Sequence, residues 1–218
     1  MRIVSAVPSL TELLVALNLD EEIAGITKFC IHPASKVNRY PRIGGTKTLK
    51  LEKILSLQPD LVIANKEENT KEQIEYLQQH CNVYLSDIST FEQALSSIRQ
   101  IGNLTGTAVR ADELVDDIQE QHARFKAPPF PSDTLYLIWY RPWMAAGADT
   151  FISDMMHLGG WKNMMHARRY PVLENQTLID LQPQTVLLSS EPYPFREFHK
   201  HQLQVLLPDA DIRLVNGE

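Results

Sequence analysis

Two residues that could do chemistry, Cys30 and His32, lie two positions apart in the stretch TKFCIHP (27–33). A thiolate and an imidazole could supply half of a zinc site, which needs three or four converging ligands. They could also be a nucleophile and its base, or ordinary loop residues before the turn that His32-Pro33 favours. The other expected loops at the same sheet edge offer no second cysteine or histidine. We therefore expect His32 either to line a binding site or to be plain loop structure.

Residues 139–147, WYRPWMAAG, gather aromatic side chains around an arginine. Trp139 continues an expected strand, so core packing is one interpretation of it. Arg141 and Trp143 flank a proline, and such a run is difficult to bury completely. Aromatic faces beside a guanidinium suit a flat ligand that carries carboxylates, such as a tetrapyrrole or a siderophore. We predict that Trp139, Arg141 and Trp143 face a ligand.

A repeat in the sequence pairs two acidic residues. The segments LQPDLVIA (57–64) and LQPQTVLL (181–188) share one device, in which a helix ends, a proline follows and a buried strand begins. Glu67 and Glu191 then lie at equivalent positions after the two strands. Exposed carboxylates are commonly just solvated, so a shared role for this pair is a hypothesis that the repeat alone does not decide.

The histidines near the end of the chain have a simpler interpretation. His199 and His201 fall in an expected helix, where residues two apart do not share a face, so both are predicted to be surface residues. His157 also falls in a helix and is expected to be a packed or exposed structural residue. The segment 168–171 (RRYP) is typical of a solvated turn.

These residues are positioned by alternating strands and helices. Capping boxes at Ser9–Glu12 and Thr70–Gln73 open two of the helices. Alternation of this kind predicts right-handed parallel sheets, with ligands beyond the carboxyl ends of the strands. The expected strands are 2–6, 22–27, 61–64, 82–86, 134–139 and 210–217, and the expected helices of the second half of the chain include 150–158.

The fold class that follows is α/β. Residues 1–88 and 128–218 form two parallel-sheet lobes, and residues 89–127 bridge them with a helix to about 102 and a longer one from 107 to about 125. Twenty helical residues span about 30 Å. A proline-rich break, APPFPSD (127–133), follows. The strand at 210–217 has no covering helix after it, so we expect that a C-terminal helix or two is missing from this chain.

Composition excludes some classes of function. The chain has 218 residues, 44% of them hydrophobic, and a net charge of −6, so no basic field invites nucleic acid. No apolar run approaches the roughly 20 residues that span a bilayer, and the N-terminus lacks a signal-peptide core. We expect a cytoplasmic protein as written, or a periplasmic one if the true N-terminus is missing. Cys30 and Cys81 fall at opposite sheet edges and are expected to be free thiols.

Three segments in order, RIVSAVPSLTELLVALNL, IGGTK…LEKILSLQPDLVIANKEEN and LLSSEPYPF, together resemble the helical-backbone (class III) periplasmic binding proteins. That class receives vitamin B12, iron-siderophores, haem and, in one branch, bare zinc or manganese ions. The resemblance implies two α/β lobes with a ligand cleft between them and a rigid bridging helix. It also implies a soluble receptor of an ABC importer, which is not an enzyme and needs no covalently bound cofactor.

The resemblance nominates particular residues. It implies that the loop with Cys30 and His32 lies at the cleft, as do Lys47 and Tyr170. Pro8 joins them because its loop follows the first strand. The resemblance further implies that Glu67 and Glu191 dock onto arginines of a membrane permease. The vitamin B12 receptor has a tryptophan near the position of Thr46, which argues against a B12 site copied whole.

The leading hypothesis is therefore a receptor for a small ligand, namely cobalamin, haem or a ferric-siderophore-type metal chelate. Its partners would be that ligand and an ABC permease, with no nucleic acid and no membrane insertion. The alternative is an intracellular metal-handling protein or enzyme on the same fold that uses Cys30 and His32. A third hypothesis is an interaction module without a ligand.

Overall fold

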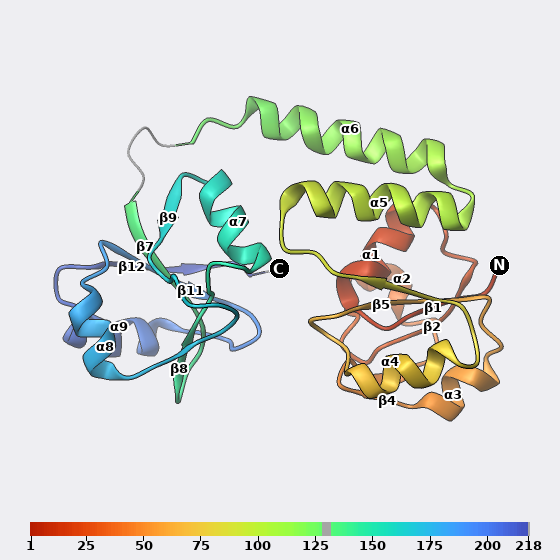
Figure 1. The fold of residues 1–218 in the computed structure, drawn as a ribbon, viewed down its shortest axis with the longest axis horizontal. Coiled ribbons are helices and arrows are strands. Elements are labelled where there is room, and N and C mark those ends of the chain that lie inside the picture. The colour runs from red at the N-terminus through yellow and green to blue at the C-terminus, as the bar shows by residue number, and fades with distance from the viewer. Residues whose placement is uncertain (128–131, 218) are drawn as a thin grey trace. The chain divides into compact units, whose positions relative to one another are not determined.

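The computed structural model describes residues 1–127 and 132–217, and the chain divides into two compact units (Figure 1). The first unit is Met1–Ile88 with Gln93–Gln121, and the second is Ser89–Glu92 with His122–Glu218. Each unit has its own sheet and its own hydrophobic core. Most of the proline-rich break expected at 127–133 lies outside the described residues. Within those residues no helix combines the length and the apolar character that crossing a membrane requires.

The sheet of the first unit is entirely parallel, with the order β2-β1-β5-β6. Its strands confirm the four expected in this half: β1 (Ile3–Ser5), β2 (Ile23–Ile26), β5 (Leu61–Asn65) and β6 (Val83–Ser86). The central strands β1 and β5 are buried on both faces, as parallel strands covered by helices must be. The remaining elements of this part are α1 (Pro8–Ala16), α2 (Ala34–Val37), α3 (Leu51–Ser56), α4 (Lys71–Gln78) and the hairpin β3 (Gly44–Gly45) with β4 (Thr48–Leu49).

Helix α1 begins differently from the expectation. Its N-cap is Val7, and Pro8 occupies the first turn, where a missing backbone N–H costs nothing. The expected capping box at Ser9–Glu12 does not form, because the chain is already helical there. Thr11 is buried instead, and its hydroxyl bonds to Ser5 Oγ at 2.8 Å and to the carbonyl of Val7 at 3.1 Å. This polar contact ties α1 to the end of β1.

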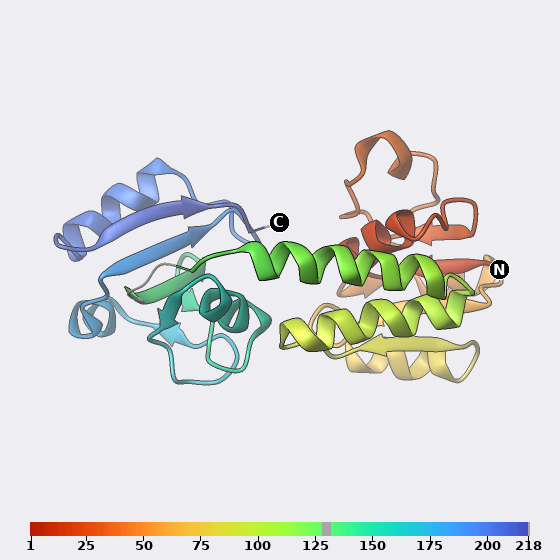
Figure 2. The same ribbon diagram turned by 90° about the horizontal axis from the view of Figure 1, so that it is seen from above.

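Helices α5 (Phe91–Thr105) and α6 (Ala108–Arg124) run side by side (Figures 1 and 2). Gly102 explains the close approach, because a Cβ there would lie 2.4 Å from Ala111 Cβ. The break between the two helices is shorter than the expected 102–106. Helix α5 continues through Thr105, and Gly106 makes the turn with a φ of +73°. With 17 residues α6 is about 26 Å long. The first unit includes these helices from Gln93 to Gln121, and the ends that extend beyond these residues belong to the second unit.

The second unit has a mixed sheet in the order β10-β8-β7-β11-β12, with β9 paired to the start of β7. Strands β7, β11 and β12 are parallel, as expected, and β9 is a further parallel strand that the sequence did not predict, whereas β8 and β10 are antiparallel additions. The elements are β7 (Ser132–Trp139), β8 (Trp143–Ala145), α7 (Phe151–Leu158), β9 (Trp161–Asn163), β10 (Val172–Leu173), α8 (Asn175–Leu181), β11 (Thr185–Ser189), α9 (Glu197–Leu206) and β12 (Asp211–Val215).

The repeat predicted from Leu-Gln-Pro is present in both units. Gln58 follows α3 with a φ of 48°, and Gln182 ends α8 with a φ of 45°. Each glutamine thus takes the left-handed conformation that stops a helix, and the proline after it prevents its resumption. A buried central strand follows in each case, β5 in the first unit and β11 in the second. The repeated unit is thus a connection in which a helix ends at a left-handed glutamine, a proline follows and a buried strand begins.

Candidate functional site

The loop after β2 presents several side chains at the carboxyl end of the first sheet. Phe29 is 51% exposed, Ile31 is 54% exposed, and Lys28 and His32 are also on the surface. The Lys28 Nζ lies over the Phe29 ring, 4.9 Å from its centroid. Arg42 holds this loop in place, because its Nη1 donates to the carbonyls of Thr27 at 3.0 Å and of Cys30 at 2.9 Å.

Cys30 does not reach the surface. It is 1% exposed, and its Sγ lies 3.1 Å from Thr11 Oγ1 and 3.2 Å from Thr27 Oγ1. The prediction that Cys30 contacts a ligand is therefore wrong, because the loop directs this side chain into the core. The metal and nucleophile interpretations of the Cys30–His32 pair lose their basis with it. In the described part of the chain, no three histidine, cysteine or acidic side chains could together hold a metal ion. Cys30 and Cys81 are both free thiols, as expected.

Neighbouring loops of the first sheet are bound together by polar side chains. Asn69 is buried and donates to the carbonyls of Ala6 at 3.2 Å and of Thr46 at 3.0 Å. It therefore links the end of β1, the β3–β4 turn and the loop after β5. Lys47 is exposed and its Nζ donates to the backbone carbonyl of Glu67. These bonds hold Lys47 and the loop after β5 on one sheet edge, where Pro8 and Glu67 are half-buried.

An aromatic cluster occupies the carboxyl end of the second sheet. Trp139 ends β7, is 39% exposed and meets the Tyr193 ring edge-on at a centroid distance of 5.5 Å. Arg141 is exposed, and its guanidinium lies 5.1 Å from the centroid of the Tyr140 ring. Trp139 and Arg141 are thus on the surface beside other rings, and their contact with a ligand stays a prediction.

Trp143 is the exception in this cluster. It is 7% exposed, its Nε1 donates to Asn175 Oδ1 at 2.9 Å, and its ring is nearly parallel to that of Phe195. The prediction that Trp143 faces a ligand is wrong, because residues 140–142 turn the chain back and place Trp143 in strand β8. The antiparallel pairing of β8 with β7 directs the indole into the core.

His199 is buried, whereas the sequence predicts that it lies on the surface, so this expectation is also wrong. Its Nδ1 accepts a hydrogen bond from the backbone N–H of Arg196 at 3.0 Å and so closes the first turn of α9. A neutral imidazole that accepts at Nδ1 carries its proton at Nε2, which lies 3.0 Å from the Tyr193 hydroxyl. His199 therefore supports the ring cluster, whereas His201 is exposed, as expected.

The segment with Tyr170 is pinned to the loop before α7. Gly147 donates to the carbonyl of Arg169 at 2.7 Å, and a Cβ at Gly147 would lie 2.3 Å from the carbonyl oxygen of Ala167. The Asp149 carboxylate accepts the backbone N–H of Arg169, and that bond, with the charges of Arg168 and Arg169, lowers the pKa of Asp149. Tyr170 is half-buried at this anchored segment.

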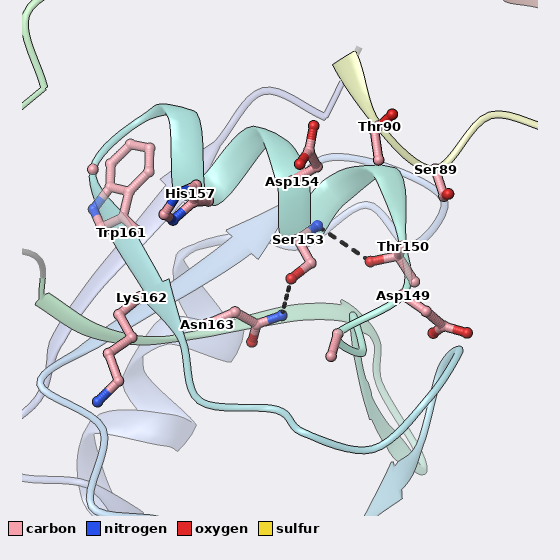
Figure 3. Close-up of a pocket in the computed structure, with 12 residues that line it drawn as sticks. Ser89, Thr90, Asp149, Thr150, Ser153, Asp154, His157, Trp161, Lys162 and Asn163 are labelled. Atoms are coloured by element: carbon pink, nitrogen blue, oxygen red, sulfur yellow. Dashed lines mark hydrogen bonds between the residues drawn. The ribbon is translucent and has the colours of Figure 1, made fainter. Parts of the chain in front are cut away.

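A pocket of about 680 Å³ lies beside α7, and sequence reasoning did not find it (Figure 3). Asp154 accepts the backbone N–H of Phe91 at 2.7 Å, while the Asn163 amide donates to Ser153 Oγ at 3.0 Å. His157 is exposed on its wall, near Trp161. The polar lining comes from segments far apart in the sequence, which is why no single motif reveals it.

The chain therefore consists of two α/β units, each with its own sheet, and the helices α5 and α6 lie in the stretch that connects the two sheets. A family model described as a periplasmic binding protein matches residues 3–207, and the chain belongs to this family. The match confirms the resemblance seen in the sequence, and the similar structures confirm the α/β fold.

Several relatives have names that describe a ligand. A vitamin B12-binding protein of Vibrio parahaemolyticus is 24% identical over 194 residues, which cover 86% of this chain and 70% of that protein. An uncharacterized ABC transporter substrate-binding lipoprotein of Bacillus subtilis is 26% identical over 205 residues, covering 85% and 62%. Both names describe binding proteins.

Solved structures match over nearly the whole chain. The periplasmic heme-binding protein HutB of Vibrio cholerae is 27% identical with a TM-score of 0.83, covering 100% of this chain and 90% of that one. The periplasmic vitamin B12-binding protein BtuF of the same organism is 21% identical with a TM-score of 0.80, covering 99% and 87%. At that lower identity the likeness shows the fold alone.

Proposed function

We propose that this chain is the ligand-binding component of an ABC importer and that its ligand is a metal chelate, namely haem, cobalamin or a ferric siderophore. The observation that carries the proposal is an exposed aromatic ring beside a cation at the carboxyl end of each sheet. In the first unit the pair is Phe29 with Lys28, and in the second Trp139 is exposed at the end of β7, shortly before Arg141, whose guanidinium lies over the Tyr140 ring.

Ring faces and cations together suit a particular ligand chemistry. A macrocycle or an aromatic chelate offers flat apolar surface to Phe29 and Trp139, and acidic substituents to Lys28 and Arg141. Such contacts hold a ligand without covalent chemistry. The names of the relatives, which include vitamin B12-binding and haem-binding proteins, support the same ligand class.

Further residues complete the proposed site. His32, Lys47 and Pro8 are the remaining candidates of the first unit, and Tyr170 is the remaining candidate of the second. Glu67 and Glu191 are proposed to dock onto a permease, since they follow equivalent strands, β5 and β11. A component of an importer works where its ligand enters, so the proposed location is the periplasm.

The proposal is tested by titrating the full chain with haem, cyanocobalamin and ferrichrome while recording absorbance spectra. We expect a shift with at least one of the three, and Trp139→Ala should weaken that binding by up to about tenfold, given about 0.5–1.5 kcal/mol for a lost aromatic contact. Phe125→Ala is the matched control, because Phe125 is also an exposed ring but follows α6 rather than a strand.

Two results would count against a chelate receptor. One is the absence of a shift with all three ligands. The other is tight zinc binding that His32→Ala abolishes, because that would restore the metal-handling hypothesis for His32. Equal losses in Trp139→Ala and Phe125→Ala would mean that the aromatic cluster of the second unit does not contact the ligand.

A further inference from the structure

A second, smaller pocket in the first unit has the chemistry of an anion site. It has a volume of about 410 Å³ and is lined by Lys28, Arg42, Gly44, Gly45, Thr48 and Lys50. Three of these six residues carry a positive charge, and none of them is acidic. The chain as a whole has a net charge of −6, so this group of cationic residues differs in charge from the rest of the protein.

The three cations are not neutralised by the protein. Neither Lys28, Arg42 nor Lys50 forms an ion pair with a carboxylate within residues 1–127 and 132–217. Lys28 contacts the Phe29 ring, and Arg42 bonds to backbone carbonyls, which carry no net charge. The pocket therefore keeps its positive potential for a mobile anion.

Arg42 is already oriented for such an anion. Its Nη1 is engaged by the carbonyls of Thr27 and Cys30, which fixes the plane of the half-buried guanidinium. The N–H groups on Nε and Nη2 have no acceptor among the described residues. A fixed guanidinium with free donors is suited to bidentate binding of a carboxylate or a phosphate.

One part of the pocket wall is formed by the main chain of two glycines, Gly44 and Gly45. Gly44 has a φ of +108°, and a Cβ there would lie 2.3 Å from the carbonyl oxygen of Thr48, so no other residue fits. A Cβ at Gly45 would come within 3.2 Å of the Phe29 ring and 3.3 Å of Lys28 Cε. Without side chains, these two positions let an anionic group approach the main chain closely.

We infer that this pocket binds a carboxylate or phosphate group, and that on the proposed function this is an acidic substituent of the imported chelate. The volume is near the low end of the roughly 300–1,000 Å³ of small-molecule sites, which suits one arm of a ligand rather than a whole macrocycle. The Phe29 ring packs against Gly45 at the edge of the pocket, so one ligand can place its ring on Phe29 and its acid beside Arg42.

The first test uses free anions and is independent of any chelate. The full chain is labelled with ¹⁵N-glycine and titrated with inorganic phosphate and, separately, with citrate, and the amide shifts of its nine glycines are followed. We expect Gly44 and Gly45 to shift most. The double variant Lys28→Met/Lys50→Met should weaken the binding by about tenfold. The control Lys53→Met removes a charge from exposed Lys53 of α3, outside the pocket, and should change it less than twofold.

The second test asks whether the anion belongs to the ligand. Haem with free propionates should lose about tenfold in affinity in the double variant, while its dimethyl ester should lose less than twofold. Shifts spread evenly over all glycines, or equal losses in Lys53→Met, would overturn the anion site. Equal losses for haem and its ester would overturn the assignment to a ligand arm. Phosphate shifts at Gly44 and Gly45 without binding of any chelate would support the pocket and reject the proposed function.

Discussion

In both units the same kind of turn precedes a central strand, but the loops that follow the strands are stabilised by different contacts. Gln58 and Gln182 adopt the same left-handed turn before a proline and a buried strand. At the far end of β5, the first unit fixes its loops with hydrogen bonds from Asn69 and Lys47 to backbone carbonyls. At the far ends of β7 and β11, the second unit packs rings together, with Trp143 and His199 among them. The turn before each central strand depends on local backbone geometry and is the same in both units, whereas the contacts at the carboxyl ends of the strands differ.

That difference makes the two units sensitive to different substitutions. Loops fixed by hydrogen bonds lose stability when a buried polar group loses its partner. A ring cluster loses stability when a cavity opens in it. The first unit should therefore respond most to changes in polar side chains, and the second to truncation of its aromatic side chains.

The largest effect is expected for Trp143→Ala. Removing this indole opens a cavity beside Phe195 and leaves Asn175 without its hydrogen-bond donor. The free energy of unfolding of the second unit should fall by about 3–5 kcal/mol. Urea denaturation followed by tryptophan fluorescence and circular dichroism measures this loss. Trp139→Ala is the matched control and should cost less than half as much, because its ring is 39% exposed. Similar losses in the two variants would mean that the second unit is not held together by its buried rings.

A smaller effect is expected for Asn69→Ala in the first unit. The substitution leaves the carbonyls of Ala6 and Thr46 without the donors that Asn69 supplies. Unfolding of the first unit should become easier by about 1–3 kcal/mol. Amide hydrogen exchange should also accelerate in the β3–β4 turn, which this side chain holds.

Asn82→Ala provides the comparison for that variant. Asn82 also donates to a backbone carbonyl, that of Asp60 at 3.3 Å, but it does so at an exposed position where water can replace it. Its loss should cost about 0.5 kcal/mol or less. If Asn82→Ala and Asn69→Ala cost the same, burial is not what makes the polar anchor of the first unit important.

Sequence reasoning succeeded where the determining contacts are local. The Leu-Gln-Pro device identified β5 and β11, and the strand pattern identified the whole parallel sheet of the first unit. The sequence also placed Trp139 and Arg141 at the carboxyl end of β7, where both are exposed.

The predictions from the sequence were wrong where residues distant in the sequence determine whether a side chain is buried. Trp143 is buried because β8 turns back against β7, a pairing that no alternation of strands and helices predicts. Cys30 is buried because Arg42, twelve positions later, holds the loop by its carbonyls. His199 is buried among rings from the turn after β7 and from the loop after β11. Phe29, which the sequence analysis did not select, stood within the TKFCIHP stretch itself and was an apolar residue in an expected loop.

The smallest effect tests the feature that the units share. Gln58→Gly and Gln182→Gly should each raise the free energy of unfolding of their own unit by about 0.5–1 kcal/mol. Glycine adopts the left-handed conformation without the steric cost that a Cβ carries, and the native turn already requires that conformation. Thermal denaturation of both single variants and of the double variant measures these gains. They should add, because the two turns belong to separate units.

Gln79→Gly is the control for both variants. Gln79 also follows a helix, α4, but has a φ of −76°, where glycine gains nothing and makes the unfolded chain more flexible. This variant should be destabilised. Stabilisation by Gln58→Gly but not by Gln182→Gly would show that the two Leu-Gln-Pro turns are alike in geometry and not in energy. The difference between the units would then begin before their central strands rather than after them.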